Sequence, residues 1–118
     1  MTPAILLTQD GRFAGAIGSA GGNAILAYVA KTIVAAVDWK MPVQQAVAAP
    51  NLVARGSSFQ GEVTKFSPEV LAGLRSRGID LKPGQGEDSG VHAVMIRDGK
   101  VDGGFDPRRE GVVLIQPR

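Results

Sequence analysis

The sequence predicts an α+β fold in which helices are stacked on an antiparallel sheet. Two Asp-Gly pairs, Asp10–Gly11 and Asp98–Gly99, each lie between two short apolar runs, a pattern typical of a β-hairpin. Helical patterns fill much of the chain between the hairpins, with few signs of the strand–helix alternation that builds parallel sheets. The 118 residues and their 44% hydrophobic content suit a single domain over 1–118 with a modest core.

The first hairpin and the helix after it carry clear patterns. The hairpin comprises residues 4–7 and 13–17, and a glycine-rich turn at Gly18–Gly22 follows it. A broad apolar stripe then recurs at spacings of one, three and four, formed by Ile25, Leu26, Val29, Ile33, Val34 and Val37. This spacing predicts a helix that is almost entirely buried and ends near Asp38.

The rest of the chain is expected to form shorter elements. A second helix begins at Met41–Pro42 and ends before Pro50. Ser67 as the N-cap, Pro68 at the first helical position and an acidic first turn predict a third helix over 68–77. Extended segments are expected at residues 51–55, 59–63, 79–82, 91–96 and 100–104, and a polar loop at 83–89.

Charge and composition exclude several classes of function. The 13 Lys and Arg residues nearly balance 11 Asp and Glu, and one Trp, one Tyr and four Phe are too few to suggest base stacking, so no nucleic-acid partner is expected. Without cysteine, disulfides, thiol catalysis and cysteine metal sites are excluded. The N-terminus lacks the basic region of a signal peptide, and glycines and Lys31 interrupt the apolar stretch at 14–37, so no membrane span is expected.

The stretch at 14–37 is more apolar than a chain of this size can readily cover. We therefore expect it to pack against a partner segment that lies outside this sequence. Without that segment, the uncovered face should cause self-association.

The glycine-rich turn allows several interpretations. A dinucleotide-binding fingerprint is excluded, because Gly15, Gly18 and Gly21 are spaced three apart and the required first pair is absent. A Walker phosphate loop is excluded as well, because Gly22 is not followed by Lys. Consecutive glycines before a helix can instead present N–H groups to a negatively charged oxygen, as in the oxyanion hole of an acyl-transfer enzyme. The alternative is that Gly21 and Gly22 merely form the turn from strand to helix.

Other polar residues are weaker candidates for chemistry. His92 is the single histidine and lies in an expected strand, where a structural role is favoured over that of a general base. Glu87, Asp88 and Glu110 could act as acids, although carboxylates in loops usually serve as solvated surface groups. No residues cluster with the spacing of metal ligands, so no metal is expected.

A charged segment near the C-terminus, Asp106–Gly111, has two interpretations. One of its arginines could bind a carboxylate of a ligand with two hydrogen bonds. Alternatively, pairing between Asp106 and an arginine of the same segment could lock a turn, and we prefer this second interpretation.

Three segments in series resemble one protein family. They are Gly18-Ser19-Ala20-Gly21-Gly22, the helix and its end at Val43-Gln44-Gln45-Ala46-Val47-Ala48-Ala49-Pro50, and Asp106-Pro107-Arg108-Arg109-Glu110-Gly111. In this order and at this separation they resemble the C-terminal part of the small subunit of γ-glutamyltransferase, also called γ-glutamyltranspeptidase, over essentially the whole chain. The start of the third helix, Phe66-Ser67-Pro68-Glu69, fits the same pattern.

The resemblance implies an N-terminal nucleophile hydrolase with an αββα sandwich, made as a precursor that cuts itself into a large and a small subunit. The new N-terminal Thr of the small subunit would attack the γ-glutamyl amide of glutathione-like compounds, and water or an acceptor amine would resolve the acyl-enzyme. Gly21 and Gly22 match the glycine pair that supplies the oxyanion N–H groups. The resemblance implies no cofactor, and bacterial relatives are usually exported to the periplasm or secreted.

Several parts of the family pattern are missing or altered. The nucleophilic Thr and a Ser-Ser pair lie upstream of the matched region, so no nucleophile or substrate-binding residue is assigned in this chain. Thr2 matches a different part of the family and is not expected to take the nucleophile's place. Ala20 stands where the family commonly has Pro, and Asn23–Ala24 where it often has Ser-Arg.

We therefore expect the chain to contribute a scaffold and oxyanion glycines to a larger enzyme, together with the missing N-terminal part of the small subunit and the large subunit. Alone it should be inactive. The alternative is a stand-alone binding or structural domain that keeps the scaffold without the chemistry.

Overall fold

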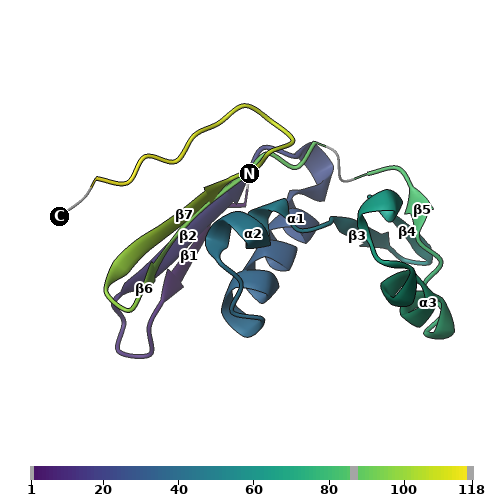
Figure 1. The fold of residues 1–118 in the computed structure, drawn as a ribbon, viewed down its shortest axis with the longest axis horizontal. Coiled ribbons are helices and arrows are strands. Elements are labelled where there is room, and N and C mark those ends of the chain that lie inside the picture. The colour runs from purple at the N-terminus through teal and green to yellow at the C-terminus, as the bar shows by residue number, and fades with distance from the viewer. Residues whose placement is uncertain (1, 86–87, 117–118) are drawn as a thin grey trace.

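A computed structural model describes residues 2–85 and 88–116 of the chain (Figure 1). Two sheets and three α-helices make up most of it. The strands are β1 (Ala4–Leu7), β2 (Phe13–Ser19), β3 (Leu52–Arg55), β4 (Ser58–Gly61), β5 (Lys82–Pro83), β6 (Val91–Arg97) and β7 (Lys100–Phe105). The helices are α1 (Ile25–Ile33), α2 (Val43–Ala48) and α3 (Pro68–Ser76). The expected α+β class is confirmed.

The larger sheet joins the two ends of the chain. Its order is β1-β2-β6-β7 with every pair antiparallel, and β2 aligns with β6 so that Ser19 lies opposite Val91. Both predicted hairpins are present. At the second one, Asp98 and Gly99 have φ angles of 49° and 73°, the left-handed backbone that Asp-Gly turns favour.

Helices α1 and α2 pack on one face of this sheet and lie between it and the smaller sheet (Figure 1). The shared core is formed by buried side chains of the helices and of alternate strand residues: Ile17, Tyr28, Val29, Val43, Val47, Val91, Ala93 and Met95. Strand residues alternate between faces, so the strand members of this core, Ile17, Val91, Ala93 and Met95, all point toward the helices.

The prediction that the first long helix is almost entirely buried was wrong. Leu26 is 71% exposed and Val34 38% exposed, while Tyr28 and Val29 on the other side are buried. An α-helix can turn about half of its surface to a single sheet, and the other face of α1, with Leu26 and Val34, lines an open groove of about 1000 Å³ that β3 and α3 border on the far side. The helical stretch ends in a π-helical turn at Val34–Asp38.

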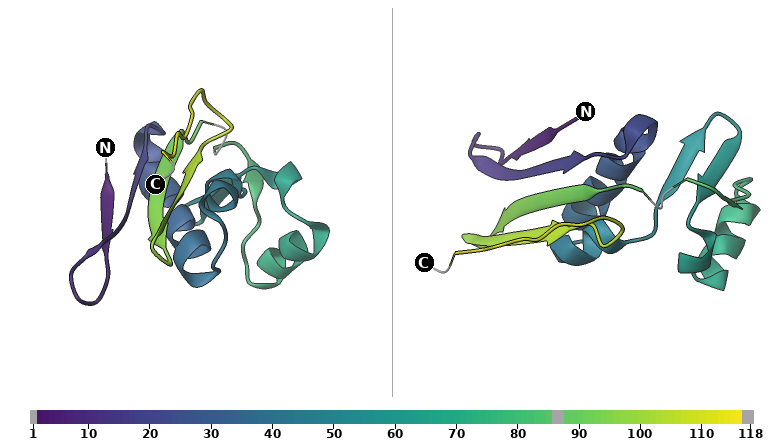
Figure 2. Two further views of the ribbon diagram at one scale, coloured as in Figure 1. Left: turned by 60° about the vertical axis from the view of Figure 1, so that its left-hand side comes forward. Right: turned by 90° about the horizontal axis from the view of Figure 1, so that it is seen from above.

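The smaller sheet has the order β3-β4-β5 and carries α3 (Figure 2). The third helix begins as predicted, because the Ser67 hydroxyl accepts a hydrogen bond from the Val70 amide at 3.2 Å. The strand expected at 79–82 is shorter and later, at Lys82–Pro83, and it runs parallel to β4. Gly78, with a φ of 80°, ends the helix as expected.

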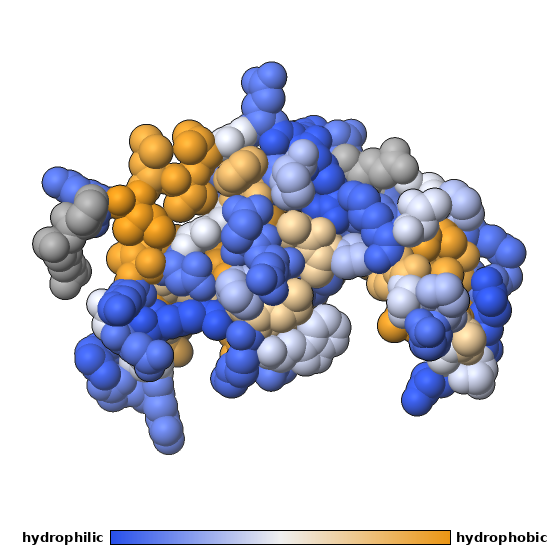
Figure 3. Space-filling model, in the orientation of Figure 1, coloured by the Kyte–Doolittle hydropathy of each residue, from blue (hydrophilic) through white to orange (hydrophobic). Residues whose placement is uncertain are grey.

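The segment at 107–116 runs past the sheet face that points away from the helices. Gly103 packs against Val113 there, and Gly111 against His92. Apolar side chains stay exposed on this side, among them Ile5, Leu7, Val112 and Leu114, and Figure 3 shows such side chains gathered over the larger sheet and this segment.

Candidate functional site

The glycine-rich turn connects the end of β2 to the short 3₁₀ turn Gly22–Ala24 and then to α1. Gly22 has a φ of 63°, a left-handed conformation that side-chain-bearing residues rarely adopt, and open space surrounds the position of a Cβ. Gly21 has a negative φ but packs beneath the ring of Tyr28, where a Cβ would clash. The two glycines are therefore required for different reasons, one for backbone conformation and one for close packing.

The backbone amides of the two glycines are also in different environments. The Gly21 N–H donates to the Ser19 hydroxyl at 3.1 Å. The Gly22 N–H has no acceptor among the residues that the structure describes. Of the predicted pair, the Gly22 amide is thus the one available to an external oxygen.

A cavity of about 560 Å³ lies beside this turn. Its lining comes from the glycine turn, the first residues of the helical stretch and the loop before β6: Gly21, Gly22, Asn23, Ala24, Tyr28, Gly84, Gln85 and Asp88. A small polar molecule would fit in this space next to both glycines.

Asn23, one of the positions that depart from the family pattern, is held by an arginine of β3, Arg55. The Arg55 guanidinium donates to the Asn23 carbonyl at 3.2 Å and to its side-chain oxygen at 2.9 Å. The same nitrogen donates to the Gln85 side chain at 3.3 Å, so Arg55 joins the glycine turn to the loop across the cavity.

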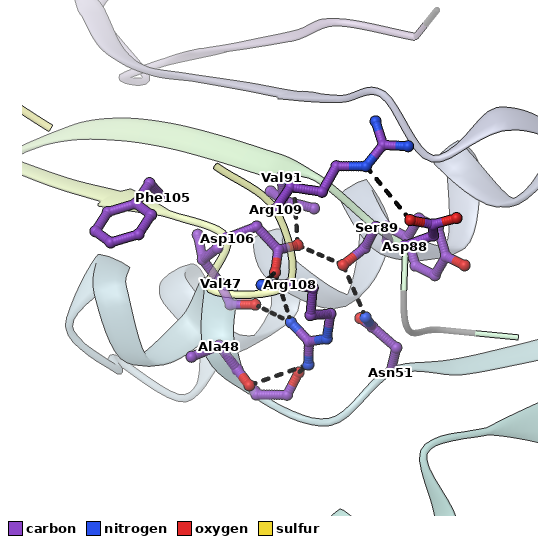
Figure 4. A network of polar contacts seen from close by, with 12 residues as sticks. Val47, Ala48, Asn51, Asp88, Ser89, Val91, Phe105, Asp106, Arg108 and Arg109 are labelled. Carbon is purple, nitrogen blue, oxygen red and sulfur yellow. Dashed lines mark hydrogen bonds and ion pairs between the residues drawn. The ribbon is translucent and has the colours of Figure 1, made fainter. Parts of the chain in front are cut away.

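Behind the glycine turn lies a network of buried polar groups (Figure 4). The Ser19 hydroxyl donates to the Ser89 carbonyl at 2.5 Å. The Ser89 hydroxyl donates to the Asp106 carboxylate, which also accepts a bond from the Val91 amide at 3.0 Å. The Asn51 side-chain amide donates to the Ser89 hydroxyl at 3.0 Å. Residues far apart in sequence thus meet directly beneath the turn.

Arg108 anchors the other end of this network. Its guanidinium forms two 2.7 Å hydrogen bonds to the Glu62 carboxylate and one of 3.0 Å to Asp106. It also donates to the carbonyls at the end of α2: Val47, Ala48 and Ala49. The structure therefore shows the internal pairing that we preferred for segment 106–111, and at 4% exposure the Arg108 side chain has no surface to offer a ligand.

The buried charges of the network stabilise one another. Burial alone would raise the pKa of Asp106, but hydrogen bonds from Ser89, Val91 and Arg108 outweigh it and hold that pKa below its ordinary value. Burial would also raise the pKa of Glu62, but the hydrogen bonds from Arg108 and Lys65 outweigh it, so this pKa is lowered as well. Burial would lower the pKa of Arg108, and its two carboxylate partners raise it instead. All three groups are ionised at neutral pH.

Lys31 on α1 is the second cation at the end of α2. Its ammonium donates to the carbonyls of Ala46, Val47 and Ala49 at 2.9 to 3.1 Å. These carbonyls carry the partial negative charge of a helix C-terminus. Burial, with a contribution from the nearby Arg108 charge, lowers the pKa of Lys31 to about 8.

The other predicted candidates do not join this site. His92 is exposed on the face of the larger sheet that points away from the helices, and Glu110 is exposed as well. Asp88 borders the cavity and lies 3.5 Å from Arg109 in an exposed ion pair. Glu87 lies outside the described residues. Among the residues that the structure describes, no three His, Asp or Glu side chains gather as metal ligands, and no helix is long and apolar enough to cross a membrane.

Sequence patterns did not single out Ser89 or Glu62, two residues on which this network depends. The polar loop before β6 indicated neither that its serine, Ser89, is buried nor what it contacts. Glu62 fell within the extended segment expected at 59–63, and its partner Arg108 lies 46 positions away.

Solved structures share this fold. A highly active mutant of γ-glutamyltranspeptidase from Pseudomonas nitroreducens matches with a TM-score of 0.81 over 100% of this chain and 62% of that chain, at 21% identity. The transpeptidase CapD from Bacillus anthracis matches with a TM-score of 0.73 over 98% of this chain and 70% of that chain, at 24% identity.

The sequence comparisons identify the family. The family model described as Gamma-glutamyltranspeptidase matches residues 1–115, and this chain belongs to that family. The glutathione hydrolase proenzyme of Escherichia coli strain K12 is 31% identical over 112 residues. This match covers 92% of the present chain and 19% of the E. coli protein, so the chain spans a small part of its curated relative.

Proposed function

We propose that this chain is the C-terminal portion of a γ-glutamyltransferase small subunit and supplies the oxyanion hole for γ-glutamyl transfer or hydrolysis. The observation that carries the proposal is the Gly22 amide, held in a left-handed turn beside a 560 Å³ cavity and without an acceptor among the described residues. A donor fixed in this way is worth about 3 kcal/mol of transition-state stabilisation in acyl transfer.

The proposed reaction needs a nucleophile from sequence outside this chain. The hydroxyl oxygen of an N-terminal Thr bonds to the γ-glutamyl carbonyl carbon, and the carbonyl oxygen takes up negative charge next to the Gly22 amide. The α-amine of that Thr accepts the hydroxyl proton and passes it to the leaving amine as the C–N bond breaks. Water or an acceptor amine then attacks the acyl-enzyme and releases Thr.

The Gly21 amide is the second proposed donor. It lines the same cavity, and while it keeps its 3.1 Å bond to Ser19 its hydrogen can be shared with a charged acceptor as a three-centre bond. Gly22 is thus the primary donor, and Gly21 contributes when the oxyanion forms.

The proposal is tested by completing the enzyme. The chain is co-produced with the large subunit and with an upstream small-subunit segment that begins with the nucleophilic Thr, both taken from the E. coli relative, and cleavage of a γ-glutamyl anilide is followed. We expect activity from the assembly and none from the chain alone. Inactivity of a folded, assembled complex would contradict the assignment.

A matched pair of variants isolates the role of Gly22 in that assembly. Gly22→Ala and Gly99→Ala both place a side chain at a left-handed backbone position with open space around it, and Gly99 lies in the distant β6–β7 turn. The two variants should lose similar stability, whereas the Gly22 variant alone should lose about 100-fold in kcat. Equal activities would show that the turn has a structural role only.

A non-catalytic scaffold is the second candidate function. The observation in its favour is that the Gly21 amide already has a partner, Ser19, within the chain. The coding DNA upstream of Met1 separates the two candidates. An in-frame continuation with the Thr and the Ser-Ser pair supports the enzyme, and a stop codon supports the scaffold.

A further inference from the structure

We infer that Ser19 and Ser89 are positioning residues that set the orientation of the glycine turn, with Asp106 as their anchor. Its consequence for catalysis rests on the proposed function, whereas the hydrogen bond that holds the Gly21 amide can be measured in the chain alone. It concerns groups that lie behind the turn and that substrate would not touch.

The Ser19 hydroxyl has a fixed direction. A hydroxyl has one hydrogen to donate, and Ser19 gives it to the Ser89 carbonyl at 2.5 Å. Its lone pairs then face the Gly21 amide, which donates to it at 3.1 Å. Since Ser19 is buried at the end of β2, water does not compete for either bond.

Ser89 is held in turn by its own side chain. Its hydroxyl donates to the Asp106 carboxylate and accepts from the Asn51 side-chain amide at 3.0 Å. Ser89 and Asp106 are both fully buried, and Asp106 is tied to Arg108. The Ser89 carbonyl that receives the Ser19 proton is therefore attached to a rigid part of the molecule.

The consequence for the turn follows from the peptide geometry. The Gly22 N–H belongs to the peptide plane that begins at the Gly21 carbonyl, and that carbonyl accepts a bond from the Ala24 amide at 3.4 Å. With the Gly21 nitrogen held by Ser19 and its carbonyl held by Ala24, rotation of this plane is restricted. The Gly22 amide thereby points in one direction before any substrate arrives.

The first test measures amide hydrogen exchange in the ¹⁵N-labelled chain. The Gly21 amide should exchange at least about tenfold more slowly than the Gly22 amide, because exchange requires the bond to Ser19 to open. In Ser19→Ala this protection of Gly21 should be lost, and Ser19→Thr, which keeps the hydroxyl, should retain it. Ser89→Ala keeps the accepting carbonyl but loses the link to Asp106, so it should reduce the protection in part.

The matched control is Ser76→Ala. Ser76 also donates to a backbone carbonyl, that of Gly73, but on the exposed surface of α3. It should leave the exchange of Gly21 unchanged. Fast exchange of Gly21 in the wild-type chain, or unchanged protection in a folded Ser19→Ala variant, would overturn the inference; the wild-type measurement applies even if that variant does not fold.

The second test uses the assembled enzyme. Ser19→Ala should lower kcat about tenfold with KM nearly unchanged, because orientation of the oxyanion donor matters most in the transition state. Ser19→Thr should restore kcat. If the exchange pattern is as expected while the wild-type assembly shows no activity, the proposed function fails and the positioning of the turn stands. A wild-type assembly that is active, with kcat unaffected by Ser19→Ala, overturns the catalytic part of the inference.

Discussion

Arg108 and Glu62, 46 positions apart in the sequence, face each other with two hydrogen bonds of 2.7 Å. Both side chains are nearly inaccessible to solvent, at 4% and 2% exposure. The pair joins the segment after β7 to the end of β4, and through the carbonyls at 47–49 it also holds the end of α2. The stability of the chain and its dependence on acid should therefore depend on these Arg108 contacts.

Replacement of Arg108 should strongly destabilise the fold. In Arg108→Leu, Asp106 keeps a buried negative charge without its cation and Glu62 keeps only its pair with Lys65, so the free energy of unfolding should fall by about 3 to 5 kcal/mol. Urea denaturation followed by circular dichroism measures it. Arg12→Leu removes an exposed pair with Asp10 and should cost little stability, because solvent screens that pair. Similar losses for the two variants would contradict the central role of Arg108.

Acid should weaken the same network. The pKa values of Asp106 and Glu62 lie below their ordinary values of 3.8 and 4.5, so in acid the unfolded chain binds protons that the folded chain does not. The stability that the ionised Asp106 and Glu62 carboxylates contribute is therefore fully present above these ordinary values, and it is lost as pH falls through the lower pKa values of the folded state. In Asp106→Asn the stability lost relative to wild type should shrink as pH falls. Urea denaturation at pH values from 6 to 3 measures this loss, and the control Asp88→Asn, which removes only an exposed ion pair, should cost little stability at neutral pH.

Alkali should raise the stability of the fold through Lys31. Its pKa falls from 10.5 to about 8 on folding, so between these values the unfolded chain binds the additional proton. The free energy of unfolding should therefore rise from pH 8 to 10.5, by an amount on the order of 3 kcal/mol. This rise should be absent in Lys31→Met and present in Lys40→Met. A wild-type curve that matches that of Lys31→Met would contradict the lowered pKa of this buried lysine.

The uncovered face of α1 should cause the chain to self-associate. Leu26 and Val34 lie two turns apart on the same side of the helical stretch and are exposed. Size-exclusion chromatography with light scattering should show concentration-dependent oligomers, and the double variant Leu26→Gln, Val34→Gln should shift them toward monomer. Val112→Gln changes an equally apolar exposed residue elsewhere. If this control alone abolishes association, the contact lies on the C-terminal segment.

Residues close together in sequence set most of the secondary structure. The Asp-Gly pairs place both hairpins, Ser67 and Pro68 start α3, and Gly78 ends it, because each acts through its own backbone conformation or a hydrogen bond within one turn. The glycine turn was recognised in the same way. Gly22 needs a left-handed backbone that a local pattern can reveal.

The tertiary structure decided how that turn is used. The sequence did not show that Ser19 meets Ser89, 70 positions away, or that this contact occupies one of the two predicted amides. Nor did it show that Arg108 is buried against Glu62, or which face of α1 stays open. Turns and helix caps depend on torsion angles and contacts a few residues apart, which the sequence contains. Burial, and the pairing of charges within it, depends on which distant segments pack together, and that is settled when the sheets and helices assemble.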